Sequence, residues 1–163
     1  MTVTRRYLTC LAALSLIAMS ACGGTKQGGG GGSAAATPAT PPIVKTATAN
    51  VAGQTQTILV DGDKGMTLYY FTPDKGGKVT CTGNCLALWP PLLAPSSTTK
   101  LVAGSGVTGM LSTVDNPDGK GKQVVYNNWP LYFWTKDKSP GDTTGQGVGG
   151  KWFVVPPDLQ PGS

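Results

Sequence analysis

The side chains that could do chemistry in this chain are few, and a pair of cysteines is the clearest case. Cys81 and Cys85 are spaced C-x3-C, whereas thioredoxin-type redox pairs are spaced C-x-x-C. In an oxidising compartment such a pair forms a structural disulfide. Kept reduced, the two thiols could instead serve redox exchange, or hold a soft ion such as Cu(I) with Met66 or Met110 as a further ligand. We expect the disulfide, and the redox or metal site is the alternative.

The chain contains no histidine. This removes the usual general base of serine and cysteine nucleophile triads, the commonest zinc and copper ligand, and the attachment motif of c-type haem. The glycine-rich run 145–150 leads into a strand-like segment, whereas nucleotide-binding glycine motifs open a helix. We therefore expect no enzymatic activity, no cofactor and no metal.

Two aspartates stand at related places in the chain. Asp74 begins the stretch DKGG and Asp137 begins DKSPG, each just after an aromatic segment. A carboxylate at such a place accepts backbone N–H groups of the following turn. The alternative is that both carboxylates grip one hard cation. Tyr69 and Tyr132 precede the two aspartates by five residues, and we expect each tyrosine to hydrogen-bond the aspartate of its own copy.

These residues recur because the chain contains a repeat. The phrase LYYFTPDK at 68–75 returns as LYFWTKDK at 131–138, an offset of 63 residues. The same offset places Trp89 on Trp152 without a gap. Two short words that matched by chance would not extend their register in this way, so the sequence indicates a duplicated unit.

The elements that position these residues are predicted to be strands. Alternating Thr, Val, Ile, Tyr and Phe are bounded by Gly, Asn, Asp and Pro, and no stretch of helical periodicity follows residue 45. Each copy gives a strand (54–60; 122–126), a turn (61–65; 127–128), an aromatic strand, a polar loop and a Trp segment. One copy of about 50 residues could scarcely stabilise itself. The predicted fold is all-β, with two pseudo-symmetric repeats of antiparallel strands forming one small sandwich or barrel-like domain.

Both copies fit the pattern Y-x-[FWY]-x-x-D. Together with CTGNCLALWPPL at 81–92 and PGDTTGQGVGGKW at 140–152, this pattern resembles the bacterial predicted lipoproteins that carry a secreted tandem repeat. That family has no established biochemical activity, so the resemblance implies a location in the cell envelope and no particular reaction. The motif residues are Tyr69, Phe71 and Asp74 in the first copy, and Tyr132, Trp134 and Asp137 in the second.

The N-terminal segment is typical of a lipoprotein signal. Arg5 and Arg6 precede an apolar run at 8–21 that ends in MSAC at Cys22, and this run is too short to span a membrane. Cys22 is the expected lipidation site; the alternative is an ordinary secretory signal cut near Ala21. The expected divisions are a signal peptide at 1–21, a lipidated flexible tether at 22–45, a two-repeat β domain at 46–157 (repeats 46–98 and 107–157) and a tail at 158–163.

The four tryptophans all fall within the repeat pattern. Large aromatic side chains are usually part of the core. The alternative is an exposed platform, formed by Trp129 and Trp134, on which a flat ligand stacks while neighbouring asparagines supply hydrogen bonds. The candidate binding residues are Trp89, Trp129, Trp152, Asn127 and Asn128.

The sequence thus predicts a non-enzymatic binding module, anchored by lipid to the membrane on the extracytoplasmic side of the bacterial cell envelope. Its expected partners are an envelope polymer, a glycan or a protein, bound by the loops 81–86 and 142–150. Lysines and aspartates alternate in the second half of the chain, which favours a solvated surface over a nucleic-acid site. The alternative function is a redox or metal-handling lipoprotein that uses Cys81 and Cys85.

Overall fold

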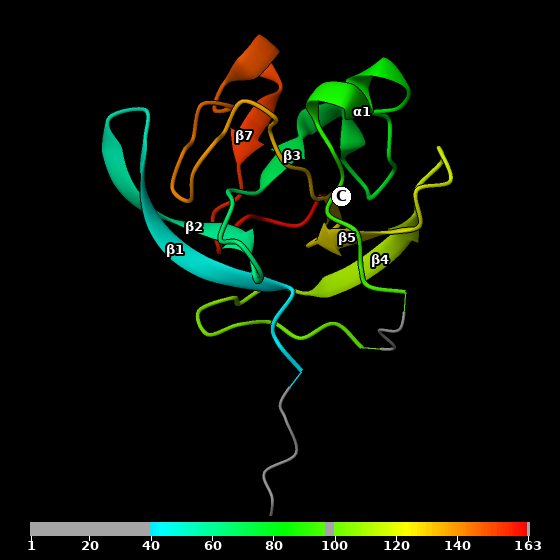
Figure 1. The fold of residues 1–163 in the computed structure, drawn as a ribbon, viewed down its shortest axis with the longest axis horizontal. Helices are drawn as coiled ribbons and strands as arrows, with labels where there is room; N and C mark the ends of the chain where they lie inside the picture. Colours follow the sequence, from blue (N-terminus) through cyan, green and yellow to red (C-terminus); the bar gives the residue numbers. More distant parts are fainter. Residues whose placement is uncertain (1–39, 97–99, 163) are drawn as a thin grey trace, which may run out of the picture. The chain divides into compact units, whose positions relative to one another are not determined.

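The computed structural model describes residues 40–96 and 100–162, whose regular structure is mainly β-strand (Figure 1). They belong to the second of two compact units of the chain, Thr37–Ser163. The predicted signal peptide, most of the predicted tether and Cys22 lie outside the described residues. Within the described part, no helix has the length and apolar character needed to cross a membrane.

Seven strands form three small antiparallel sheets in the described residues, and none of the sheets closes into a barrel. The all-β fold predicted from the sequence is confirmed. Strand β1 pairs with β2, β3 pairs with β7, and β5 lies between β4 and β6. The strands are β1 (Val44–Val51), β2 (Gln54–Asp61), β3 (Tyr69–Phe71), β4 (Leu111–Asp115), β5 (Lys122–Tyr126), β6 (Trp129–Pro130) and β7 (Trp152–Val154).

Three short helical segments interrupt the strands within the described residues: η1 (Thr72–Asp74), α1 (Asn84–Leu88) and η2 (Val148–Gly150). The sequence predicted no helix. A helix of five residues such as α1 is too short to show a helical period, which explains why pattern reasoning did not find it.

The two repeats meet at their aromatic segments. The N–H of Tyr69 donates to the carbonyl of Tyr132 at 2.9 Å, and the N–H of Tyr132 donates to the carbonyl of Tyr69 at 3.0 Å. This reciprocal pair relates each repeat to the other by a half-turn. A pseudo-twofold axis therefore passes between the two equivalent tyrosines.

Backbone hydrogen bonds outside this pair obey the same symmetry. Leu68 donates to Leu59, and its equivalent Leu131 donates to Val124. The equivalent residues Leu59 and Val124 are separated by 65 positions instead of 63, because the turn after β2 is two residues longer than the turn after β5. The two repeats thus have the same backbone hydrogen-bond pattern, and this difference in length lies in the turn.

The turn after β5 confirms a prediction. Asn127 and Asn128 join β5 to β6 with φ angles of 46° and 64°. Two consecutive residues with positive φ make the tight hairpin turn that suits twisted strands, and asparagine tolerates this conformation better than most residues.

The aromatic strand has a separate core on each of its faces. Tyr69 and Tyr132 belong to one buried cluster, and Leu68 and Leu131 belong to the other. Successive side chains of an extended segment point to opposite faces, so each aromatic segment is covered on both of its faces, although the second forms only an isolated bridge at Tyr132. The repeats share both cores, and neither repeat has a core of its own.

The ends of the domain differ from the predicted boundaries. Strand β1 begins at Val44, which is fully buried, so the domain starts before residue 46. At the other end, the predicted tail packs on the β5–β6 turn: Gly162 donates its N–H to Asn127 at 2.9 Å, and the indole of Trp129 donates to the carbonyl of Gln160 at 2.9 Å. A buried indole N–H needs an acceptor, and the last residues supply it.

Candidate functional site

The tyrosines and aspartates of the repeat motif are exchanged between the repeats. The hydroxyl of Tyr69 donates to Oδ2 of Asp137 at 2.6 Å, and the hydroxyl of Tyr132 donates to Oδ2 of Asp74. Each tyrosine therefore bonds the aspartate of the other copy. This corrects the expectation of a bond within one copy, and the reason is the pseudo-twofold axis, which brings each tyrosine next to the opposite repeat.

The second oxygen of each aspartate holds a local loop. Oδ1 of Asp74 accepts the N–H and the hydroxyl of Thr80 at 2.8 and 2.5 Å. Oδ1 of Asp137 accepts the same groups of Thr144 at 3.0 and 2.6 Å. Both carboxylates are buried, and both are used as acceptors inside the fold. This supports the turn-capping interpretation over a shared cation, and the described residues contain no group of three or more Cys, Asp or Glu that could hold a metal ion.

Burial also shifts the pKa values of both tyrosines and of Asp74. The pKa values of Tyr69 and Tyr132 are raised far above the usual value of 10.0, mainly by burial and further by the hydrogen bond to an aspartate. The pKa of Asp74 is raised above 3.8 by burial, although its bonds to Thr80 and Tyr132 oppose the shift. The tyrosines therefore remain neutral donors at physiological pH.

Four aromatic rings form a continuous stack between the two repeats, in the order Phe71, Trp152, Trp89, Trp134. The ring centroids of Trp89 and Trp152 are 3.8 Å apart with an interplanar angle of 2°. Phe71 stacks on Trp152 at 4.2 Å, and Trp134 stacks on Trp89 at 4.1 Å. The stack obeys the pseudo-twofold axis, because Phe71 and Trp134 are equivalent, as are Trp89 and Trp152. The third position of the motif is thus a ring that covers the other repeat's tryptophan.

This arrangement corrects the idea of an aromatic binding platform. Trp89, Trp129, Trp134 and Trp152 are all buried, so their faces are covered by protein. Burial of aromatic surface stabilises the fold, and the tryptophans serve as core.

The asparagines assigned to the edge of that platform have structural partners as well. The side chain of Asn127 accepts the N–H of Met110 at 2.8 Å and donates to the carbonyl of Leu159 at 2.7 Å. Asn128 is exposed, but the buried Trp129 beside it offers no ring face for a ligand.

The predicted disulfide between Cys81 and Cys85 is present. Cys81 is buried in the core and Cys85 lies in α1. Between them, the N–H of Gly83 donates to Oδ2 of Asp118 at 2.6 Å. The disulfide loop of the first repeat is thereby attached to the β4–β5 hairpin of the second.

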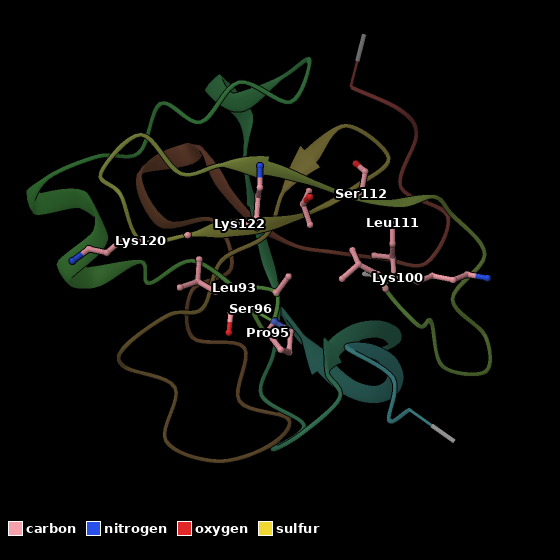
Figure 2. Close-up of a pocket in the computed structure, with 12 residues that line it drawn as sticks. Leu93, Pro95, Ser96, Lys100, Leu111, Ser112, Lys120 and Lys122 are labelled. Carbon is pink, nitrogen blue, oxygen red and sulfur yellow. The ribbon is translucent and has the colours of Figure 1, made fainter. Parts of the chain in front are cut away.

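The surface that sequence reasoning missed is a groove of about 750 Å³ beside β4 and β5 (Figure 2). Its floor is aliphatic and its polar groups are hydroxyls and ammonium groups. Every charged side chain that lines it is a lysine. The lining residues are Leu93, Ala94, Pro95, Ser96, Lys100, Leu101, Leu111, Ser112, Thr113, Lys120, Gly121 and Lys122.

The lysines stand around the rim of this groove. Figure 2 shows Lys100 and Lys120 on opposite sides and Lys122 between them, with the three side chains pointing away from one another. Lys122 forms an ion pair with Asp115 at 2.7 Å, in which the two side chains are 58 % and 81 % exposed. An ion pair this exposed is weak. Asp115 offsets one of the three lysine charges, and Lys100 and Lys120 keep the groove positive.

The aspartates that lie among the lysines keep their charge, but three of them are bound to groups of the fold. Asp118 accepts a backbone N–H of the disulfide loop, and Asp137 accepts the hydroxyl of Tyr69. Asp142 caps the N–H groups of Lys138 and Ser139, and these bonds lower its pKa. The repeat motif and its turns place these aspartates at fixed positions in the sequence. This spacing indicates a structural role, but the role became clear only once the fold was known.

A second groove, of about 810 Å³, lies near the start of the domain and is lined by Pro41, Ile43, Phe133 and their neighbours. Its rim has both signs of charge, with Asp61 and Asp63 next to Lys64. The loops predicted to bind, 81–86 and 142–150, line neither this groove nor the basic one, although Gln146 of the second loop lines a smaller groove of about 290 Å³ beside β2.

Comparison with known proteins agrees with the duplicated architecture. The family model Lipoprotein_15, described as a secreted repeat of unknown function, matches residues 52–93 and again 112–156, together more than half of the chain. No curated protein and no solved structure matches the chain.

Proposed function

Because the chain belongs to the family of secreted repeats of unknown function, we propose that it is a non-enzymatic binding module on the extracytoplasmic side of the cell envelope. In this proposal a lipid on Cys22 anchors the module to the membrane. The two interlocked repeats form the scaffold, and the basic groove beside β4 and β5 is the binding surface.

The observation that supports the proposal is that the polar groups of the repeat motif are buried and bonded, whereas the lysines of the groove are exposed. The polar groups of the repeat motif are occupied within the fold: Tyr69 and Tyr132 bond Asp137 and Asp74. The groove, by contrast, exposes lysines over an aliphatic floor. Groups satisfied inside a rigid core serve structure, while a concave surface with a single sign of charge favours recognition of a ligand of the opposite sign.

The anchor is supported by the sequence alone. An apolar run of fewer residues than a membrane span, preceded by Arg5 and Arg6, ends at Cys22. Stable attachment needs more than one acyl chain, as a lipidated N-terminal cysteine provides. Residues 23–42 are mainly Gly, Ala, Ser, Thr and Pro, a composition suited to a spacer.

The absence of catalysis rests on the chemistry of the chain. It has no histidine, its two domain cysteines are joined to each other, and Asp74 and Asp137 already accept several hydrogen bonds each.

The experiment combines location with binding. In the parent organism, Cys22→Ser should move the protein from the detergent-extracted fraction to the soluble or uncleaved fraction. Purified chain should bind washed envelope fragments, and the Lys100→Gln/Lys120→Gln variant should bind several-fold less. The matched control is Lys78→Gln/Lys151→Gln, which removes the same charge from exposed lysines that do not line the groove. Equal binding by the two double variants would contradict the proposed site.

A further inference from the structure

We propose that the groove and the adjacent edge of β4 bind an acidic peptide segment of a partner protein, which adds to the sheet as a further strand. The inference rests on the proposed binding function and names the chemical class of the partner. It is carried by three features of the same surface: an edge strand, a rim of lysines and an aliphatic floor.

Strand β4 is an edge strand. Within the described residues it pairs with β5 alone. Two backbone hydrogen bonds just outside the ladder, from Asn127 to Met110 at 3.0 Å and from Asn116 to Gly121 at 2.9 Å, fix which residues of β4 face β5. The alternate residues turn their N–H and C=O groups away from β5, where an added strand finds partners. These outward-facing residues are Leu111, Thr113 and Asp115.

The outward-facing backbone and the groove are contiguous. Leu111 and Thr113 line the groove, and they belong to the residues whose backbone groups face outward. A peptide that paired with this edge would therefore place alternate side chains over the groove. Leu111 of β4 and Leu101, which pack on the same core, would cover the apolar parts of such side chains, whereas Leu93 lies on the other side of β5.

The charges select an acidic partner. The three lysines of the rim point apart in Figure 2, so a single small anion could not meet all of them. An extended chain with several carboxylates could. Asp115 is the partner of Lys122 in the free protein, and a peptide carboxylate could replace this exposed contact at little cost.

Other ligands fit this surface less well. Sugar rings are usually held by aromatic faces, yet the groove is lined by no aromatic residue, and the tryptophans are buried. A lipid headgroup brings one phosphate and no backbone donors for the edge of β4. The peptide alone uses the edge, the lysines and the floor together.

The first test measures the anisotropy of a fluorescein-labelled peptide of ten alternating Glu and Val residues, mixed with the full chain in non-ionic detergent. Binding should weaken as salt rises, because exposed charges are screened. Lys100→Gln and Lys120→Gln should each weaken binding about three-fold, and the pair about ten-fold, as expected for separate surface ion pairs. Lys78→Gln/Lys151→Gln should leave binding unchanged.

The second test asks whether the peptide adds as a strand. N-methylation removes backbone donors, so methylating either all Glu or all Val residues blocks one edge of the peptide. Pairing with β4 predicts that one of these two peptides loses binding and the other keeps it. In the protein, Thr113→Pro removes an outward N–H and should abolish binding while the thermal midpoint is kept, since proline is tolerated on the free side of an edge strand. If this variant does not fold, the two methylated peptides decide.

Three results would overturn the inference: no binding at low salt, equal loss with both methylated peptides, or equal effects of groove and control lysines. Binding to vesicles of anionic phospholipid that exceeds peptide binding would replace the peptide by a membrane. A dimer of the full chain that Thr113→Pro dissociates would replace it by a second copy. If envelope fragments still bind through Lys100 and Lys120 while the peptide does not, the inference fails and the proposed function stands.

Discussion

Tyr69 donates its hydroxyl to Asp137 at 2.6 Å across 68 positions of the chain, and the hydroxyl also accepts the N–H of Gly145 at 3.2 Å. Tyr132 makes the equivalent bond to Asp74. Each buried tyrosine hydroxyl finds its acceptor in the other repeat, so the repeat motif stabilises the pairing of the two copies. The motif contributes to binding only by holding the sheet that presents the groove.

The exchanged bonds should be visible as pairwise coupling. Tyr69→Phe should lower the free energy of unfolding by about 1–3 kcal/mol, because Asp137 and the N–H of Gly145 each lose a buried partner. In double-mutant cycles with Asn substitutions, Tyr69 and Asp137 should couple by about 0.5–3 kcal/mol. Tyr69 and Asp74, which share a repeat but no hydrogen bond, should be nearly additive. Coupling between Tyr69 and Asp74, with additivity between Tyr69 and Asp137, would instead support a hydrogen bond within one copy.

A repeat expressed alone should not fold. Residues 40–96 and 100–162 share both cores and the stack of Trp89 on Trp152, and a chain of about 60 residues without its own core is marginal. Each half should give an unfolded amide spectrum by NMR, and mixing the halves should restore dispersed signals. A half that folds alone would show that the repeats are independent units.

Stability should fall in alkali. The pKa values of Tyr69 and Tyr132 are raised above 10.0 in the folded state, so above pH 10 the unfolded chain releases protons that the folded chain keeps. The stabilisation is complete below pH 10 and decreases by about 1.4 kcal/mol per pH unit for each tyrosine above it. Urea unfolding at pH 8, 10 and 11 measures this slope. Tyr69→Phe should remove its own share of the slope, about 1.4 kcal/mol per pH unit, and a slope unchanged in that variant would rule out this source.

Reduction of the disulfide should act locally. Opening the Cys81–Cys85 loop should cost about 2 kcal/mol on the loop-entropy model, and it should release the bond from Gly83 to Asp118 that attaches the β4–β5 hairpin. Amide exchange should increase in α1 and at the hairpin tip, while β2 stays protected. Faster exchange throughout the domain would show instead that the disulfide supports the whole core.

Much of the fold could be predicted because it follows local rules. The Asn127–Asn128 turn follows from the backbone conformation that asparagine tolerates, and the covered aromatic strand follows from apolar side chains on both of its faces. A local rule also explains a difference between the repeats. The second repeat forms strand β7 from Trp152, whereas the equivalent segment from Trp89 forms only isolated bridges. Pro90 and Pro91 in that segment lack the N–H groups that a continuous strand needs.

The site could not be predicted in the same way, because it depends on how distant segments meet. The spacing of Tyr69 and Asp74 suggests a local bond, and only the pseudo-twofold axis redirects it to Asp137. The lysines of the groove come from 100 and from 120–122, and they become a rim only when the segment around Leu93 packs against β5. A repeat pattern predicts the features that the two copies share. The groove is formed by segments in which the copies differ, so the pattern does not predict it.

The most direct test of this division of roles compares two variants side by side, with thermal stability and binding to washed envelope fragments measured on the same samples at 20 °C. Tyr132→Phe should lower stability by about 1–3 kcal/mol and bind like the unaltered chain while it remains folded. Lys100→Gln/Lys120→Gln should keep its thermal midpoint and bind several-fold less. Loss of binding by folded Tyr132→Phe, with normal binding by the lysine variant, would place the site on the motif and contradict the account.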